Sequence, residues 1–419
     1  MLRAARNILR LLTIARTLAR HDALFPLTWL PALGWIARTV EPLAAFAARP
    51  DVRDRRAGER LAMALEALGP SFIKLGQALS TRSDLIGDRL AADLGALRDR
   101  LPPFPSHVAR STIENELGKS VPELFAAFDD RPVAAASIAQ VHLAMTRGSS
   151  GAPDAPVAVK VLRPGVEQAF ERDLEAFRWL ARVIDRTRPR LRRLRLNEVV
   201  ETLAESVRQE MDLRLEAAAA SELGENFRGD PTYRVPSVDW SRTARRVLTL
   251  ERVHGIPVHE AGAVRAAGHD PDEIVGRAVV VFFNQVFRDG FFHADMHPGN
   301  LFVAGDGALV AVDFGIMGRL DWRTRTYLAD MLAGLLTHDY ERVADAHFRA
   351  GYVPAHKSRA AFTQAVRSIA EPIFGRPTHE ISIARLLGRL FGLAEQFEMA
   401  ARPELLLLQK TMLMAEGVG

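Results

Sequence analysis

Apolar and polar positions divide the chain into a helical beginning, a short strand-rich part and a long helical end. Residues 1 to about 125 have helical periodicity, interrupted by four prolines between positions 26 and 50 and by Pro-Pro-Phe-Pro at 102–105. After about residue 130 the pattern is that of strands. Residues 137–144 alternate between apolar and polar positions, and residues 157–162 form an apolar run around one lysine. The polar loop between these two strands predicts a hairpin.

The second half of the chain is predicted to be mainly helical. Residues 172–184 and 196–223 have long helical patterns, and we expect one continuous helix over each. Residues 247–250 form a further strand pattern, and residues 301–303 and 309–312 form a short hairpin. A small strand-rich lobe followed by a large helical lobe predicts an α+β fold that is predominantly helical overall, with an N-terminal helical extension.

The composition excludes several classes of protein. Hydrophobic residues make up 48% of the chain and charged residues 25%, which is enough to bury a core beneath a charged surface. Cysteine is absent, so disulfides and thiolate metal sites are excluded and a reducing compartment is favoured. A net charge of +4 over 419 residues does not indicate nucleic-acid binding by itself.

The N-terminus has the pattern of a basic amphipathic helix. Residues 1–21 include five arginines and no acidic residue, and the stretch 25–46 that follows is apolar and contains tryptophan. Such a segment suits the surface of an anionic membrane. A helix packed on the protein's own core is an equally good interpretation. A mitochondrial transit peptide is a third, although the segment is poor in serine.

The strongest chemical signal is His293-Ala-Asp295-Met-His297-Pro-Gly-Asn300, followed by Asp313-Phe-Gly. Phosphoryl transfer needs a carboxylate near the acceptor, and an amide oxygen and a second carboxylate that hold Mg²⁺ against the phosphates. Asp295, Asn300 and Asp313 have the spacing of such a set; a polar loop with a helix-capping aspartate is the alternative. The two histidines have no third ligand at zinc-like spacing, so we expect them to be structural.

A lysine that ends an apolar strand is the second signal. Lys160 in Val-Ala-Val-Lys is expected to direct its ammonium towards nucleotide phosphates, which requires a helix carboxylate to hold it. The candidates are Glu210, Asp212 and Glu216, of which the last two are predicted to share a helix face by i,i+4 spacing. A solvated acidic helix face is the alternative.

The loop before the lysine strand has alanines where a protein kinase has glycines. It reads Ala134-Ala135-Ala136-Ser137. Alanine lacks the left-handed freedom of glycine, so we expect a stiffer loop that approaches the phosphates differently. The Ser137 hydroxyl is a candidate contact for a phosphate or for the metal.

Taken together, these motifs resemble the UbiB/ABC1 family of atypical protein-kinase-like proteins. The resemblance covers residues from about 60 to 320 and includes a KxGQ motif in the N-terminal extension. It implies four segments: a basic amphipathic segment (1–55), a helical extension (56–128), a kinase-like N-lobe (129–254) and a helical kinase-like C-lobe (255–419). The motifs occur in the family's order: Lys74-Leu75-Gly76-Gln77, Ala134 to Ser137, Val157 to Lys160, Glu210-Met211-Asp212, His293 to Asn300, and Asp313-Phe314-Gly315.

The resemblance also implies roles for individual residues. Lys160 would contact the phosphates of ATP or ADP and pair with Glu216. Asn300 and Asp313 would hold Mg²⁺, and Asp295 would take the position of the catalytic-loop aspartate.

A second group of implied roles concerns the extension and the adenine. Lys74 would pair with Glu210 and Asp212, so that the segment with Gly76 and Gln77 covers the place where a kinase admits a peptide. The Glu251 carbonyl and the Val253 amide would face adenine.

The function that the resemblance implies is support of ubiquinone (coenzyme Q) biosynthesis at a membrane, by ATP hydrolysis or by phosphorylation of a small molecule. A nucleotide-gated scaffold that presents lipid intermediates to biosynthetic enzymes is the first alternative, and an active protein kinase is the second. The expected partners are an anionic membrane surface, polyprenyl quinone precursors and quinone-biosynthesis enzymes. We expect the cytoplasmic side of a bacterial inner membrane, or alternatively a mitochondrial inner membrane. The chain ends at Gly419 without an apolar span, which favours peripheral association.

Overall fold

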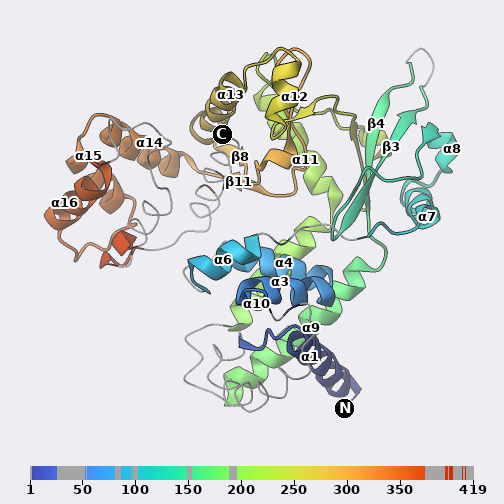
Figure 1. Cartoon of the computed structure of the whole chain (residues 1–419), viewed down its shortest axis with the longest axis horizontal. Coiled ribbons are helices and arrows are strands. Elements are labelled where there is room, and N and C mark those ends of the chain that lie inside the picture. Colours follow the sequence, from blue (N-terminus) through green and yellow to red (C-terminus); the bar gives the residue numbers. More distant parts are fainter. Residues whose placement is uncertain are drawn as a thin grey trace. The chain divides into compact units, whose positions relative to one another are not determined.

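The computed structural model divides into two units, and each is described by itself (Figure 1). Unit 1 comprises Met1–Glu222 and Pro236–Val253, and unit 2 comprises Leu223–Val235 and His254–Gly419. The structure describes residues 2–25, 52, 54–80, 86–95, 97, 102–148, 153–187, 196–372, 392–394, 396–399, 408 and 411.

Helices form the described N-terminal part of unit 1, as the sequence predicts. Apolar side chains such as Leu65, Phe72 and Leu94 bury one another in a shared core cluster. Gly69 has a φ of +103°, which only glycine adopts readily, and it makes the turn between the second and third of these helices. The helices are α1 (Leu2–Arg20), α3 (Ala57–Leu68), α4 (Pro70–Ser80) and α6 (Asp88–Gly95).

The sheet of unit 1 is antiparallel, with the strand order β1-β3-β4-β6 and with β2 paired to β3. The three valines of β4 pack with α7 and α8 in one core cluster, whereas Leu162 packs with α9 and α11 in another. Successive strand residues point to opposite faces, so Lys160 lies on the same face as Leu162. The elements are α7 (Ser106–Leu117), α8 (Val121–Leu124), β1 (Phe125–Phe128), β2 (Ala134–Ala135), β3 (Ala139–Thr146), β4 (Pro156–Leu162), η4 (Trp240–Arg242) and β6 (Val247–Glu251).

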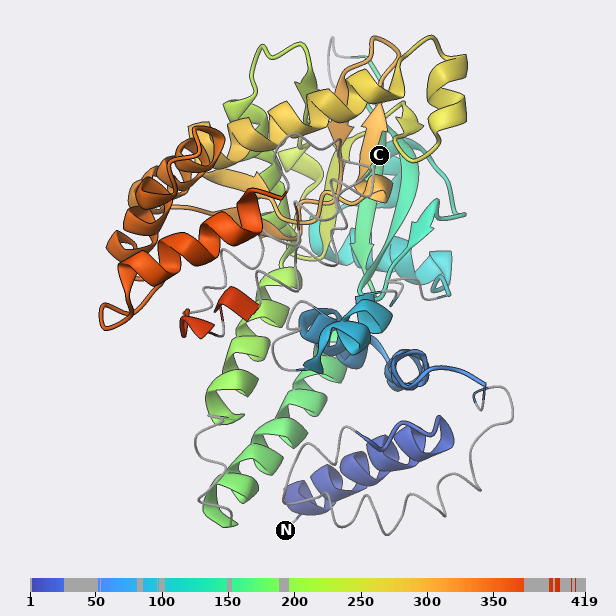
Figure 2. The same ribbon diagram turned by 60° about the vertical axis from the view of Figure 1, so that its left-hand side comes forward.

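The continuous helix expected over residues 196–223 is wrong, because the chain breaks before Leu213. The Asp212 carboxylate accepts the Arg214 N–H at 3.2 Å, and the Leu213 N–H donates to the Arg245 carbonyl at 2.9 Å. Both amides are thereby taken out of the helical ladder, and a new helix begins. The helices are α9 (Val166–Thr187), α10 (Leu196–Glu210) and α11 (Leu213–Asn226), and Figure 2 shows α9 and α10 packed side by side.

Unit 2 contains two small sheets. The hairpin predicted at 301–303 and 309–312 is present as β9 and β10, and a parallel strand and a third antiparallel strand extend it in the order β5-β10-β9-β7. A second sheet pairs β8 with β11 and was not predicted. The strands are β5 (Tyr233–Arg234), β7 (Ile256–Pro257), β8 (Phe291–His293), β9 (Leu301–Val303), β10 (Leu309–Ala311) and β11 (Met317–Arg319).

The other elements described in unit 2 are helices, as expected. The last three described helices pack against one another around Tyr340 and Phe362 (Figure 2). Among the helices described, none combines the length and the apolar character needed to cross a bilayer. The helices are α12 (Ala261–Ala266), α13 (Pro271–Phe283), the π-helix η5 (Asn284–Asp289), the 3₁₀ turn η6 (Pro298–Asn300), α14 (Trp322–Leu336), α15 (Tyr340–Arg349) and α16 (Arg359–Ala370).

Candidate active site

Lys160 forms a buried ion pair with Glu216 in unit 1. The Lys160 Nζ donates to both Glu216 carboxylate oxygens, at 2.8 and 2.9 Å, and the two side chains are 16% and 7% exposed. Pairing with β3 and β6 on either side fixes the backbone of the lysine, and the first turn of α11 holds the glutamate. The lysine and the carboxylate that were predicted to pair are therefore in contact, although they are 56 residues apart in the sequence.

Lys74 is bound to Glu210, one of the two partners expected for it. The distance from the Lys74 Nζ to the Glu210 carboxylate is 2.8 Å, and it joins α4 of the extension to the last residue of α10. Asp212 is bonded to Arg214 at 2.6 and 2.9 Å, and this side-chain hydrogen bond lowers the pKa of Asp212. Because Asp212 precedes α11, the predicted i,i+4 relation between residues 212 and 216 on one helix is wrong.

Gly76 is required by the packing of the extension. A Cβ at this position would lie 2.3 Å from the Leu97 Cδ1 and 2.7 Å from the Leu65 Cδ1. Real Cβ atoms do not approach other atoms this closely, so a side chain at residue 76 would displace both leucines. The glycine of the KLGQ segment therefore allows α4 to approach its neighbours in the core of the extension.

The alanine-rich loop is held by backbone hydrogen bonds. Ala134 and Ala135 form β2 and pair with Val141 and Gln140, and the Ala136 N–H donates to the Ala139 carbonyl at 2.7 Å. Ser137 is fully buried, so its hydroxyl reaches a phosphate or a metal only if the loop opens. The expectation of a stiff loop agrees with this pairing.

The segment expected to face adenine lies at the end of β6. Glu251 pairs with Val157 in the sheet, and its backbone N–H donates to the Ser237 carbonyl at 2.9 Å. Val253 is the last residue of unit 1 before the chain enters unit 2. The contacts of residues 251 and 253 with adenine remain a prediction.

In unit 2, His293 joins the two signature segments. Its Nδ1 accepts the Asp295 N–H at 3.1 Å, so the Nε2 bears the proton and donates to the Val312 carbonyl at 3.2 Å. Complete burial lowers the pKa of His293, which keeps the ring neutral and able to accept at Nδ1. The histidine thus fixes Asp295 relative to the residue before Asp313, in agreement with the structural role expected for it.

Asn300 and Asp313 are brought together at the base of the β9–β10 hairpin. The Val312 N–H donates to the Asn300 carbonyl at 2.9 Å, which places the residue before Asp313 beside the asparagine. The Asn300 Nδ2 donates to the Asp295 carbonyl at 3.1 Å, so the amide nitrogen is occupied and Oδ1 is the atom left for a ligand. The sequence separation of thirteen residues is thus spanned by one short hairpin.

Asp313 has a strained backbone, with a φ of +64°. Non-glycine residues adopt this left-handed region rarely, and such strain is concentrated at functional sites. His297 braces the same loop, because its Nδ1 accepts the Gly299 N–H at 2.9 Å and closes the turn before Asn300.

The oxygens of Asn300 and Asp313 are of the kind that Mg²⁺ prefers, because it binds hard carboxylate and amide ligands. No group of three or more His, Asp or Glu side chains is placed to hold a metal ion within the described parts of the chain. A magnesium site needs no such group when phosphate oxygens and water complete the coordination. The residues present therefore fit a nucleotide-bound Mg²⁺.

Residues 96–347 match the family described as the ABC1 atypical kinase-like domain, and residues 366–419 match the UbiB helical domain. The chain belongs to the ABC1 atypical kinase-like family. Relatives named "Probable protein kinase UbiB" are 43% identical in Marinobacter nauticus, over 98% of this chain and 74% of the relative, and 42% identical in Xanthomonas campestris, over 99% and 75%.

A solved structure of another protein shares the fold of this ABC1 chain. The complex of Rv3197 with erythromycin from Mycobacterium tuberculosis is 24% identical, with a TM-score of 0.58 over 82% of this chain and 86% of that one. The expectation of a kinase-like α+β fold preceded by N-terminal helices is confirmed.

Sequence reasoning about this ABC1 chain missed a buried glutamine behind the segment from His293 to Asn300. The Gln285 Oε1 accepts the His293 N–H at 2.8 Å, from within the π-helix η5. The two adjacent amides in the otherwise apolar stretch Phe-Phe-Asn-Gln-Val-Phe were the available signal. Short π-helical turns of this kind in a helix often occur at functional sites.

Proposed function

We propose that this ABC1-family chain binds ATP or ADP with Mg²⁺ and acts as an atypical kinase or ATPase in ubiquinone biosynthesis at a membrane. The observation that supports this best is the joint placement of Asn300 and the strained Asp313, with Asp295 fixed beside them through His293. These residues form an oxygen-ligand pair next to a carboxylate, which is what phosphoryl transfer requires.

Each residue has a defined role in this proposal. Asn300 and Asp313 would hold Mg²⁺, which would neutralise charge on the phosphates. Asp295 orients the attacking hydroxyl or water and accepts its proton. Lys160 donates to the phosphates, and Glu216 keeps the lysine extended and charged.

The nature of the acceptor is proposed from the extension. The Lys74–Glu210 ion pair and the packing at Gly76 fix α4 within unit 1. The resemblance implies that this segment covers the place where a protein kinase admits its substrate chain. We therefore favour water or a small molecule as the acceptor.

The relatives are named "Probable protein kinase UbiB", which favours a protein kinase as a second candidate function. A scaffold that uses the nucleotide only as a signal is the third. It shares the binding residues and differs in having no turnover.

Magnesium-dependent phosphate release from ATP tests these alternatives. The purified protein is assayed with and without liposomes of anionic lipid, beside Asp313→Asn and Lys160→Ala. We expect release that liposomes stimulate and both substitutions abolish. Nucleotide binding with no more release than Asp313→Asn would reject the enzyme in favour of the scaffold, and labelled phosphate on added protein substrates would favour the protein kinase.

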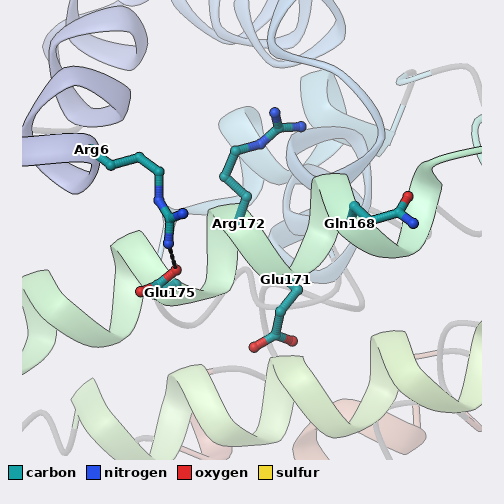
Figure 3. A pocket seen from close by; sticks show the side chains of 5 residues that line it. All are labelled: Arg6, Gln168, Glu171, Arg172 and Glu175. Atoms are coloured by element: carbon teal, nitrogen blue, oxygen red, sulfur yellow. Dashed lines mark hydrogen bonds and ion pairs between the residues drawn. The ribbon is translucent and has the colours of Figure 1, made fainter. Parts of the chain in front are cut away.

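The membrane part of the proposal rests on α1. One side of this helix is bound to the protein: Arg6 pairs with Glu175 and Arg10 with the buried Asp173, each at 2.6 Å. Figure 3 shows Arg6 reaching Glu175 of α9. Both residues line a hollow of about 360 Å³ together with Gln168, Glu171 and Arg172. These contacts support the packed-helix interpretation for this side.

The opposite side of α1 is apolar and exposed. Ile8, Leu9 and Leu12 are 45%, 65% and 60% exposed, and Arg16 and Arg20 on the same side are exposed as well. Apolar side chains flanked by arginines suit insertion at the surface of an anionic bilayer. We propose that this face of α1 is the membrane contact, while the other face holds the helix to the protein.

The absence of cysteine provides a direct test of the membrane contact. A single cysteine at Thr13, an exposed position of α1 at the edge of this face, can be labelled with an environment-sensitive fluorophore. Emission should shift to the blue with vesicles containing anionic lipid, and the shift should be lost in a Leu9→Ser, Leu12→Ser variant. An equal shift in both proteins would contradict the assignment of this face.

A further inference from the structure

The extension joins the sheet of unit 1 through the Pro-Pro-Phe-Pro turn, and Phe104 of that turn is anchored by a side chain of β3. The Phe104 N–H donates to the Gln140 Oε1 at 3.0 Å, and the Gln140 Nε2 donates to the Phe104 carbonyl at 3.3 Å. Both residues are buried. The glutamine thus satisfies both backbone groups of a buried residue that belongs to no strand.

The orientation of the Gln140 amide is fixed by His142. The His142 Nδ1 donates to the Asp129 carbonyl at 2.8 Å, so its Nε2 is the acceptor for the Gln140 Nε2, also at 2.8 Å. Burial lowers the pKa of His142, which keeps the ring in the neutral form that this bond requires. A flipped amide would lose its bonds to both Phe104 and His142.

Arg163 connects the same turn to the alanine-rich loop. One guanidinium nitrogen donates to the Pro102 carbonyl at 3.0 Å and to the Ala136 carbonyl at 3.2 Å, and the guanidinium carbon lies 5.4 Å from the centre of the Phe104 ring. The Arg163 backbone N–H donates to the Ile138 carbonyl at 2.7 Å. This arginine follows β4, the strand that contains Lys160.

We propose that Phe104, Gln140 and Arg163 form a clasp that sets the position of the alanine-rich loop, and that Arg163 is a positioning residue for nucleotide binding. Two adjacent residues in the middle of the loop are attached to the clasp, since Ala135 pairs with Gln140 and the Ala136 carbonyl is bound by Arg163. The turn at residues 102–105, where the extension enters the sheet, therefore holds the alanine-rich loop in place. The nucleotide part of this inference rests on the proposed function, whereas the clasp itself does not.

Hydrogen exchange of the nucleotide-free protein tests the clasp, and nucleotide titration of the same samples tests the positioning role. Arg163→Met retains the aliphatic packing and removes the donors. Arg172→Met, on an exposed position of α9, makes the same chemical change away from the loop and is the matched control. Arg163→Lys, which retains the charge and lacks the planar guanidinium, gives the same decision if the methionine variant does not fold.

In Arg163→Met we expect faster exchange in both residues 102–109 and residues 134–140, and nucleotide binding about fivefold weaker, which corresponds to about 1 kcal/mol. Arg172→Met should behave as the wild type in both measurements. Unchanged exchange, or faster exchange in one segment only, would overturn the clasp. Faster exchange in both segments with unchanged affinity would overturn the positioning role. If the wild type binds no nucleotide, the proposed function and the positioning role fail together, and the exchange data still decide whether the clasp exists.

Discussion

Removing one member of the Lys160–Glu216 pair should destabilise the protein far more than removing both. Lys160→Met leaves a carboxylate that is 7% exposed without its lysine. Breaking a buried pair in this way costs about 3–5 kcal/mol, and because Lys160 is itself 16% exposed we expect about 3 kcal/mol. Glu216→Met leaves the ammonium buried instead and should cost a similar amount.

The double variant Lys160→Met, Glu216→Met replaces the pair with two apolar side chains of similar length. Such replacements are often neutral for stability, so the double variant should unfold within about 1 kcal/mol of the wild type. Urea unfolding of the four proteins at pH 7 gives the coupling free energy directly. The double variant should still fail to release phosphate, which would separate stability from function.

This reasoning would be refuted if the loss of unfolding free energy in the double variant equalled the sum of the losses in the two single variants. Additive losses would mean that the ion pair is not the interaction that each substitution removes. The pH dependence gives an independent check, because protonation of a buried Glu216 that has lost Lys160 relieves its burial cost. The deficit of Lys160→Met should therefore shrink as the pH falls from 7 to 5, whereas that of Glu216→Met should not.

Three other outcomes are expected. Gly76→Val should lower the free energy of unfolding by about 2 kcal/mol or more, because its side chain must displace Leu97, and an unchanged urea midpoint would show that the extension yields to it. His142 and His293 have folded pKa values lowered by burial, so below the unfolded value of about 6.5 the unfolded state takes up protons first. The free energy of unfolding should thus be level from pH 8 to 7 and decline from about pH 6.5 to 5, and a level profile down to pH 5 would contradict the neutral tautomers. Gln285→Met should reduce the rate constant for phosphate release at saturating nucleotide with little change in nucleotide affinity. Weaker nucleotide binding with an unchanged rate constant would contradict a role of Gln285 in holding the segment that contains Asp295.

The sequence was sufficient where the chemistry imposes a spacing. The spacing of Asp295, Asn300 and Asp313 along the sequence predicted that a hairpin brings a carboxylate, an amide and a second carboxylate together. In the structure the β9–β10 hairpin places Asn300 beside Val312, the residue before Asp313. The buried-strand run around Lys160 predicted β4 for the same reason, since a continuous apolar pattern is long enough to be recognised.

Short and long-range features could not be predicted in this way. The strands β8 and β11 have three residues each, which is too few for a period of two to be visible. The break before α11 depends on a hydrogen bond from Leu213 to the carbonyl of Arg245, and the anchoring of Phe104 depends on a side chain 36 residues away. Such contacts are set by tertiary packing, which outweighs local propensity.

The most direct test of the proposed function is a calorimetric titration of ADP into the wild type and Asp313→Asn, with and without Mg²⁺. Asparagine tolerates the positive φ that residue 313 adopts, so the variant should fold as the wild type does while losing a charged magnesium ligand. We expect magnesium-dependent binding by the wild type, at least about tenfold weaker in Asp313→Asn, or about 1.4 kcal/mol. Equal affinities in the two proteins, with or without Mg²⁺, would contradict the assignment of Asp313 and with it the proposed site.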